Sequence, residues 1–408
     1  MKRAKNNELS YKNCTEYTLW GFLRRFIAAE RLTKRAGLPM MVLFNIECGG
    51  IYAHSGNGRN DDLATISDVA KRAGVSVMTV SRVINKSARV SDDMIERVNR
   101  AISELNYRPN MVARGLATRH THMIAYVFSN LANPFFAAVS MGIQNACAEK
   151  GYTMILFDIT SAERFNECLD TLIDRRIDGV VFHHLDVRQE NVDSLRSNGV
   201  CVATIDNEVD LEGVTSVNGD DYEAARMATR HLIDRGYRRI GCVHEQYEDR
   251  SDENRGKKDY IQLFQRRIWK NRTRGFLDEM RSASLEPVCM IEGSGTADIA
   301  FAEDKESLQR ILAPENRPCA LYCENDIIAL AVLSESMRQG IRVPQEIAII
   351  GHDGLDYGMM LYPRLTTVCQ PRYEMGSLAA RRLIDTIEHK SENEIIFTHS
   401  TVVVGDTT

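Results

Sequence analysis

The sequence predicts two parts: an all-α helix-turn-helix head and an α/β core made of two doubly wound parallel-sheet lobes. Residues 63–109 carry three stretches of apolar residues at helical spacing. Beyond them, short apolar runs alternate with amphipathic stretches, which is typical of buried parallel strands joined by crossover helices. This second part, residues 122–408 of a 408-residue chain, is longer than one core normally holds, so we expect two lobes with a ligand between them.

Composition and charge narrow the class of protein. The formal net charge is −5, 44% of the residues are hydrophobic and only 9 are Pro, which excludes collagen-like and disordered chains. Residues 63–122 carry 10 Lys and Arg against 5 Asp and Glu, whereas residues 123–408 carry 31 against 45. A basic head therefore precedes an acidic core.

Cysteine usage and hydropathy indicate the compartment. Ten Cys are too dilute for a disulfide scaffold, and none forms a C-x-x-C pair. The longest apolar stretch is interrupted by Asn45 and Glu47, and polar residues follow the positively charged start where a signal peptide would be apolar. We expect a cytoplasmic protein with no membrane partner.

Residues 1–62 are expected to form an N-terminal extension that ends in a turn-rich linker at residues 54–62. Residues 18–35 can form a helix with apolar side chains on one side. Two interpretations stay open for it: a membrane-surface or partner-binding helix, and an appended segment of no consequence.

The first helix of the head is marked at both ends. Thr65 is placed to cap it, and Asp68, three residues on, completes a capping box. Gly74 supplies the left-handed stop, which a residue with a side chain adopts only at a cost.

Two further helices complete the head. Ser76 caps a helix over residues 77–85, and Ser91 begins a third helix that Pro109 ends. The apolar residues that the third helix turns inward are Met94, Ile95, Val98, Ile102 and Leu105.

The second helix leaves four side chains exposed that can enter a major groove: Val77, Met78, Ser81 and Arg82. Arg82 can present a bidentate fork to guanine, and Val77 and Met78 can contact thymine methyl groups. The alternative is a generic three-helix bundle whose cationic face is merely solvated.

Eight apolar runs of the core predict strands, at residues 123–129, 153–159, 178–184, 200–206, 239–245, 288–293, 319–325 and 347–353. Ligands of such sheets bind outside the carboxyl ends of the strands. The polar residues there, which suit a polyol, are Asp206, Asn325, Asp326, His352 and Asp353.

His183 and His184 also end a run. Adjacent strand residues point to opposite faces of a sheet, so we expect structural or rim histidines and no shared metal ion.

The stretch LATISDVAKRAGVSVMTVSRVINKSARVSDDMIERVNRAISELNYRPNMVARGLATRHTHMIAYV, residues 63–127, resembles the DNA-binding head of the lactose/galactose-repressor (LacI/GalR) family of bacterial transcription regulators. The resemblance continues to residue 408. It implies that Val77 and Met78 begin the recognition helix and that Arg82 matches a base-contacting arginine. The positions where the family places small polar groups, chiefly on phosphates, are Ser76, Thr79, Ser81 and Asn85.

Residues 110–121 resemble the hinge helix and linker of the family. Eight residues from Asn110 are too few for a stable isolated helix, so the hinge is expected to fold only on DNA. There Leu116 would wedge into the minor groove, with an ordinary linker residue as the alternative. A pair of hinges implies a homodimer, a near-palindromic double-stranded operator and a location on the nucleoid.

The core resembles the effector-binding core of the family, which is similar to periplasmic sugar-binding proteins. The resemblance implies a small-molecule effector, expected to be a carbohydrate. We expect neither a cofactor nor a metal ion. The residues it places on the effector are Phe135, Phe136, Asp206, Arg272, Asn325 and Asp353. For each carboxylate, the alternative role is a helix cap or a bridge between lobes.

Three features depart from the family pattern. Residues 246–271 form a long charged insertion, which weakens the alignment of Arg272. The C-terminal residues lack an apolar heptad repeat, so we expect a dimer rather than a tetramer. Family members usually begin where Leu63 stands, so residues 1–62 are expected to be an artefact of the gene model.

The sequence gives little support to an enzyme. It contains no P-loop, no H-E-x-x-H and no G-x-S-x-G motif. We therefore predict a regulator, most simply a repressor. Two alternatives stay open: a sugar-binding protein of the periplasmic type that has lost regulation, and a sugar-active enzyme.

Overall fold

The computed structural model describes residues 64–85, 90–108, 120–207, 210–245, 266–293, 306, 309–310, 312–317, 319–389 and 393–408. The chain divides into two units, one up to Arg108 and one from Pro109 onward. The N-terminal extension 1–62, the hinge residues Asn110 and Leu116, and residues 246–265 of the charged insertion lie outside the described residues.

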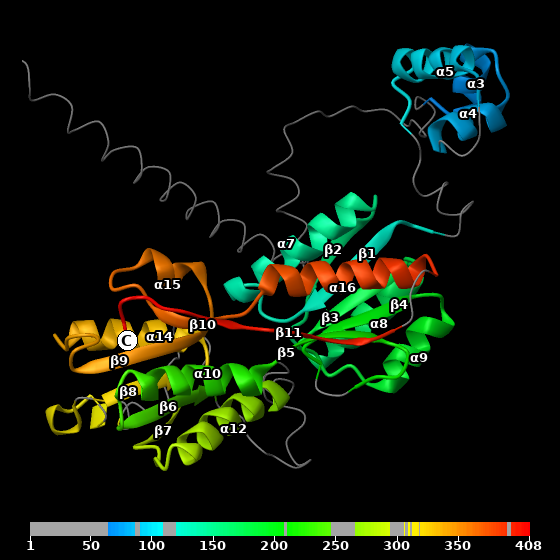
Figure 1. The fold of residues 1–408 in the computed structure, drawn as a ribbon. Helices are drawn as coiled ribbons and strands as arrows, with labels where there is room; N and C mark the ends of the chain where they lie inside the picture. Colours follow the sequence, from blue (N-terminus) through cyan, green and yellow to red (C-terminus); the bar gives the residue numbers. More distant parts are fainter. Residues whose placement is uncertain are drawn as a thin grey trace, which may run out of the picture. The chain divides into compact units, whose positions relative to one another are not determined.

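Three helices form the head: α3 (Ile66–Ala73), α4 (Val77–Asn85) and α5 (Asp92–Glu104) (Figure 1). The predicted capping box is confirmed: the Asp68 amide donates to the Thr65 hydroxyl, and the Thr65 amide donates to the Asp68 carboxylate. The buried core of the head consists of Val69, Ala70, Ala73, Val80, Val98 and Ala101.

The third helix differs from its prediction. It starts after Ser91, but the Ser91 hydroxyl makes no capping hydrogen bond. It ends at Glu104, and Asn106 follows with φ 46°, in the left-handed region that interrupts a helix. The inward placement of Met94 is wrong, because this side chain is 39% exposed and Ala101 occupies the core instead.

The N-terminal lobe of the core is a six-stranded parallel sheet in the order β11-β5-β4-β3-β1-β2. Helices α7 and α16 cover one face, and α8 and α9 cover the other. The strands are β1 (Met123–Phe128), β2 (Thr153–Asp158), β3 (Gly179–His183), β4 (Cys201–Ile205), β5 (Thr215–Gly219) and β11 (Ile395–Thr398). The helices are α7 (Pro134–Glu149), α8 (Ala162–Asp174), α9 (Gln189–Ser197) and α16 (Arg372–Ile387).

The C-terminal lobe repeats this plan, with strand order β12-β10-β9-β8-β6-β7 and only β12 antiparallel to its neighbour. Helices α10 and α12 cover one face and α14 covers the other. The strands are β6 (Ile240–Glu245), β7 (Met290–Gly293), β8 (Cys319–Cys323), β9 (Ile347–Asp353), β10 (Thr366–Cys369) and β12 (Thr401–Val403). The helices are α10 (Asp221–Asp234), α12 (Arg266–Ser282), α14 (Asp326–Arg338), α15 (Asp356–Met360) and the short 3-10 helix η1 (Pro314–Asn316).

The chain passes between the two lobes three times, from β5 to α10, from β10 to α16 and from β11 to β12 (Figure 1). Each passage leaves a sheet at the carboxyl end of a strand. The carboxyl ends of both sheets therefore lie at the junction of the lobes, where ligands of such folds bind.

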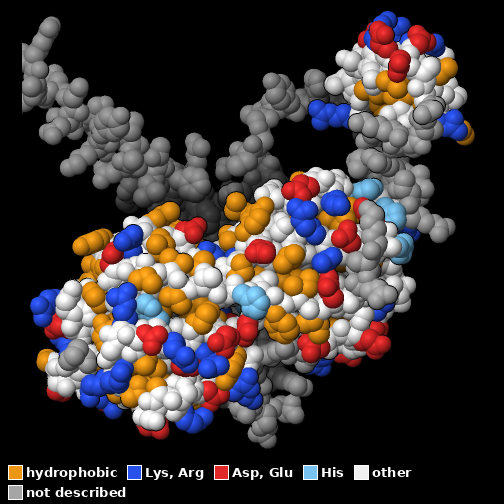
Figure 2. All heavy atoms as spheres, in the orientation of Figure 1, with side chains coloured by type: hydrophobic (Ala, Val, Ile, Leu, Met, Phe, Trp, Pro, Cys, Tyr) orange, Lys and Arg blue, Asp and Glu red, His pale blue; other side chains and the backbone are white. Residues whose placement is uncertain are grey.

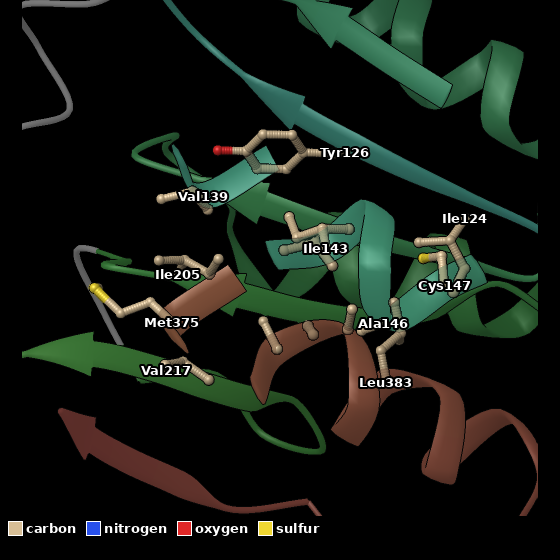
Figure 3. Packing of buried hydrophobic residues seen from close by; sticks show 14 of the residues in the cluster. Ile124, Tyr126, Val139, Ile143, Ala146, Cys147, Ile205, Val217, Met375 and Leu383 are labelled. Carbon is tan, nitrogen blue, oxygen red and sulfur yellow. The ribbon is translucent and has the colours of Figure 1, made fainter. Parts of the chain in front are cut away.

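The core of the N-terminal lobe depends on α16, which comes late in the sequence. Figure 3 shows Leu383 and Met375 of this helix beside the sheet, with Ala146 of α7 next to Leu383. Helices α7 and α16 approach each other closely because a glycine of α7 lies at their contact. A Cβ on Gly142 would lie 2.0 Å from the Tyr373 carbonyl oxygen of α16.

All eight predicted runs contain a strand. The prediction missed β5, β10, β11 and β12, which have only three to five residues each. The two cysteines closest in sequence, Cys319 and Cys323, are both buried, and neither belongs to a disulfide. Within the described residues, no helix combines the length and the apolar character that a membrane crossing requires.

Candidate DNA-binding helix and ligand cleft

One face of α4 is exposed to solvent, and it carries both apolar and polar side chains. The Thr79 amide donates to the Ser76 hydroxyl at 3.1 Å, so the predicted cap of this helix is confirmed. Val77 is 45% exposed and Met78 63% exposed, although both are large and apolar. Arg82 lies exposed one turn further on, whereas Val80 faces the core and is fully buried.

The remaining predicted DNA-binding residues of α4 lie around this face. Ser76 is exposed and its hydroxyl is 2.9 Å from that of Thr79. Thr79 and Ser81 are half-buried, and Asn85 is the last residue of the helix.

The turn between α3 and α4 is held by an arginine of α5. The Arg97 guanidinium donates to the Ala73 carbonyl oxygen at 2.7 Å and to the Gly74 carbonyl oxygen at 2.9 Å. Gly74 itself has φ 64°, which lets the chain reverse here without the strain that a Cβ would bring. These contacts fix the direction of α4 relative to α3 and α5.

The core contains a cleft of about 70 Å³ at the junction of the lobes. It is lined by ends of β4, β5 and β11 from one lobe and by α10 and α12 from the other. The lining residues are Asp206, Asn207, Asn218, Gly219, Asp220, Asp221, Tyr222, Ile268, Asn271 and Phe397.

Asp206 follows β4 and is the centre of a buried polar cluster. Its Oδ1 atom accepts a hydrogen bond of 2.7 Å from the Gly219 amide. Its Oδ2 atom lies 3.3 Å from His184 Nε2 and 3.7 Å from His183 Nε2. Burial alone would raise the pKa of Asp206, but the two imidazoles outweigh it and hold the pKa of this carboxyl well below its usual range.

The two histidines approach each other, with ring centroids 4.4 Å apart. The expectation that they point apart is wrong, because β3 ends at His183 and His184 has φ 53°, outside the extended conformation. Burial and the neighbouring His184 lower the pKa of His183 to about 4, so His183 is neutral at pH 7. Its Nδ1 atom lies 2.7 Å from the Tyr126 hydroxyl.

The predicted aromatic residues Phe135 and Phe136 belong to the first turn of α7 and pack on these histidines. The Phe135 ring stacks on His184 with centroids 6.0 Å apart, and Phe136 meets His183 edge-on at 4.9 Å. Both phenylalanines are buried. They support the wall of the cleft and are not among the residues that line it.

Arg272 of α12 is buried among acidic groups of the C-terminal lobe. It donates to Asp221 at 2.8 Å and to the Glu324 carbonyl oxygen at 2.5 Å, and it lies 3.3 Å from Asp353. Its guanidinium also lies 4.9 Å from the ring centroid of Trp269.

The carboxylates around Arg272 titrate above their ordinary range. Burial raises the pKa of Asp221 to about 6, although Arg272 lowers it in part. Burial likewise raises the pKa of Asp353, whose Oδ1 atom also accepts from Gln370 at 3.0 Å. Asp353 has φ 116°, a strained conformation for a residue with a side chain.

Asn325, predicted as an effector residue, caps a helix in the structure. Its Oδ1 atom accepts from the Ile328 amide at 2.8 Å and caps α14. The next residue, Asp326, accepts from the Thr367 hydroxyl and the Leu355 amide, and burial raises its pKa to about 8.

Of the six predicted effector residues, only Asp206 lines the cleft itself. Arg272 and Asp353 contact each other, and Arg272 also contacts the cleft residue Asp221. Residues that the sequence reasoning missed come mainly from β5 and from the start of α10: Asn218, Asp220, Asp221 and Tyr222. The polar stretch Asn-Gly-Asp-Asp after a Thr-Ser-Val run was the available signal.

Comparison with known proteins agrees with this geometry. The family model described as "Bacterial regulatory proteins, lacI family" matches residues 65–110, and "Periplasmic binding protein-like domain" matches residues 229–408. The transcriptional repressor PurR of Aliivibrio salmonicida is 33% identical over 339 residues, which is 82% of this chain and 96% of the relative. PurR of Vibrio cholerae is 32% identical over 85% of this chain and 98% of its own length.

Solved structures show the same architecture. The transcriptional regulator CelR in complex with cellobiose has a TM-score of 0.59 at 29% identity and covers 85% of this chain and 100% of its own. The lac repressor dimer bound to operator and the anti-inducer ONPF has a TM-score of 0.69 at 22% identity and covers 85% of this chain and 99% of its own. The chain belongs to the lacI family of bacterial regulatory proteins and is a regulator rather than an enzyme.

Proposed function

We propose that this protein is a homodimeric transcriptional repressor of the cytoplasm and nucleoid, which binds a near-palindromic operator and responds to a small metabolite between its lobes. The observation that carries the proposal is the exposed face of α4, where two large apolar side chains stand beside an unburied arginine. Surfaces of this kind suit base edges, because methyl groups and guanine acceptors occur side by side in the major groove.

Each residue of α4 has a role in this proposal. Arg82 reads guanine, and Val77 and Met78 contact thymine methyl groups. Phosphate contacts come from Ser76, Thr79, Ser81 and Asn85. Asn110 and Leu116 belong to the hinge, where Leu116 enters the minor groove.

A second copy of the chain is the proposed occupant of an apolar surface around α15. Tyr357, Met359, Met360, Leu361 and Tyr362 are all exposed, with Met360 at 78% and Tyr362 at 86%. Figure 2 shows hydrophobic side chains gathered on this part of the C-terminal lobe. Large apolar patches are rare on monomers, and the related lac repressor structure is a dimer.

The proposed effector is a carbohydrate or a carbohydrate derivative. The cleft presents carboxylates and amides, which bind paired hydroxyl groups well, and Tyr222 and Phe397 supply aromatic surface. The related CelR structure contains cellobiose. Asp206, Arg272, Asn325 and Asp353 would contact the effector or orient the groups that do, with Phe135 and Phe136 behind them.

Binding of such an effector requires the lobes to separate. The cleft of about 70 Å³ is smaller than the roughly 300–1,000 Å³ of ordinary ligand pockets. The ion pairs of Arg272 with Asp221 and Asp353 would then exchange for contacts with hydroxyl groups. A change of lobe closure would alter the spacing of the two hinges and hence the stability of operator binding.

The test is sequence-specific DNA binding by the full chain. We expect selection from random duplexes to yield a near-palindrome, and Arg82→Ala to weaken binding to it by about 1–3 kcal/mol. Arg100→Ala is the control, because it removes one positive charge from the exposed surface of α5, where Arg100 pairs with Glu96. It should lower the affinity for all DNA equally and leave the preference for the selected sequence unchanged. Equal binding of the unmutated protein to selected and scrambled duplexes would refute the proposal and favour a binding protein without regulation.

A further inference from the structure

The cluster of His183, His184 and Asp206 presents buried donor atoms that the protein does not use. Neither Nε2 atom of the two histidines has a hydrogen-bond partner among the described residues, and His184 Nδ1 has none either. His183 is fully buried and His184 is 9% exposed. Buried polar atoms without a partner cost free energy, so their persistence points to a ligand that satisfies them.

We propose that His183, His184 and Asp206 bind one divalent transition-metal ion, with Zn²⁺ or Co²⁺ as the chemistry that fits. This inference revises the expectation of a metal-free core and goes beyond the proposed function. Two imidazoles and one carboxylate are a donor set that such ions take, and three protein ligands leave a further position for water or for a ligand in the cleft.

The distances between the ligand atoms are compatible with coordination of one ion. One ligand nitrogen or oxygen of each residue lies within 4.8 Å of the other two. Asp206 Oδ2 is 3.3 Å from His184 Nε2 and 3.7 Å from His183 Nε2. In a tetrahedral Zn²⁺ site with bonds of about 2.0–2.1 Å, ligand atoms stand about 3.3 Å apart.

The backbone holds the three ligands together. His183 pairs with Ile205 in the register of β3 and β4, so His184 and Asp206 follow at matching positions at the ends of neighbouring strands. Both adopt the left-handed conformation, with φ 53° and φ 50°. That conformation is costly for residues with side chains, and it turns both side chains to one place.

Hydrogen bonds from neighbouring groups already orient two of the three ligands. The Gly219 amide holds Asp206 Oδ1, which leaves Oδ2 for the ion. The Tyr126 hydroxyl lies 2.7 Å from His183 Nδ1 and can accept its proton, which leaves Nε2 with a free lone pair. In Figure 3 the Tyr126 hydroxyl points away from Ile124, toward the end of the sheet where Ile205 lies.

The charge of the cleft also favours a cation. Asp206, Asp220 and Asp221 all line it. Arg272 compensates Asp221, whereas among the described residues the ion pairs of Asp206 are those with the two imidazoles.

The experiment titrates the full chain, stripped with a chelator, with Zn²⁺ by calorimetry and with Co²⁺ by visible absorption. We expect one equivalent to bind, and X-ray absorption at the metal edge to show two imidazole ligands. His184→Asn and Asp206→Asn should abolish binding, and Tyr126→Phe should weaken it about tenfold as a positioning change.

His352→Gln is the matched control. This buried histidine also has an unpartnered Nε2 atom and a tyrosine hydroxyl, that of Tyr322, 2.9 Å from Nδ1, but no other described residue completes a metal cluster with it. It should bind the ion as the unmutated protein does. Absence of saturable binding, or an absorption spectrum without imidazole ligands, overturns the proposal even if the variants fail to fold. Operator binding measured on the same samples keeps this outcome separate from the proposed function.

Discussion

Replacement of Arg272 by Met tests whether the buried ion pairs at the lobe junction support the core. Arg272 is 3% exposed and its guanidinium contacts Asp221, Asp353 and the Glu324 carbonyl oxygen. Removal of one partner of a buried pair leaves an uncompensated charge and costs about 3–5 kcal/mol. For a core of nearly 300 residues, whose unfolding entropy is about 0.6 kcal/mol/K, that corresponds to a thermal midpoint roughly 5–8 °C lower.

The assay is thermal unfolding of the full chain followed by near-ultraviolet circular dichroism at pH 7.5. Arg338→Met is the matched control, because Arg338 forms an exposed pair with Glu335 and its loss should leave the midpoint almost unchanged. Adding Asp221→Asn to Arg272→Met should restore part of the loss, because the second change removes the unpaired carboxylate. Equal midpoints for Arg272→Met and Arg338→Met, or a double variant that loses the sum of both single changes, would refute the reasoning.

Two further predictions concern packing and pH. Gly142→Ala should lower the thermal unfolding midpoint of the core. The new Cβ would lie 2.0 Å from the Tyr373 carbonyl oxygen and 2.9 Å from the Ser377 amide nitrogen, so α7 and α16 must move apart. An unchanged midpoint would contradict this close packing. The pKa of the Asp326 carboxyl is raised to about 8 in the folded protein, above its value in the unfolded chain. The folded state therefore holds a proton near pH 7 that the unfolded state does not. The free energy of unfolding should fall as the pH rises from 7 to 8, by up to about 1.4 kcal/mol. Urea titrations at both pH values should show this slope in the unmutated protein and lose it in Asp326→Asn; a slope that survives the substitution would assign the effect to another group.

The sequence was most informative where local rules and burial agree. The capping box of Thr65 and Asp68, the stop at Gly74 and the long apolar strands β1, β3, β8 and β9 were all predictable, because each is encoded within a few neighbouring residues. Strand β5 was not, since four of its five residues are Thr, Ser, Asn and Gly. Strand β11 was not, since it has only four residues and its pairing with β5 joins segments about 180 positions apart.

The ligand cleft shows the same limit. Asp206 was predictable because it ends an apolar strand, whereas Asn218 and Asp221 depend on the unpredicted strand β5. The histidine pair was misinterpreted for a different reason: alternation of side chains applies only inside a strand, and the left-handed conformation of His184 cannot be read from its side chain. Adjacent residues at a strand end therefore need a structure before their directions can be assigned.

The threefold passage of the chain between the lobes bears on synthesis at the ribosome. The sheet of the N-terminal lobe is mostly translated once β5 is complete, but α16, which covers one of its faces, begins at Arg372, some 150 residues later. At 5–20 residues per second, that apolar face waits about 8–30 s for α16. During that interval, a nascent chain of this protein exposes the apolar sheet face that α16 later covers. Chaperones that bind emerging polypeptides would have this face to shield from aggregation.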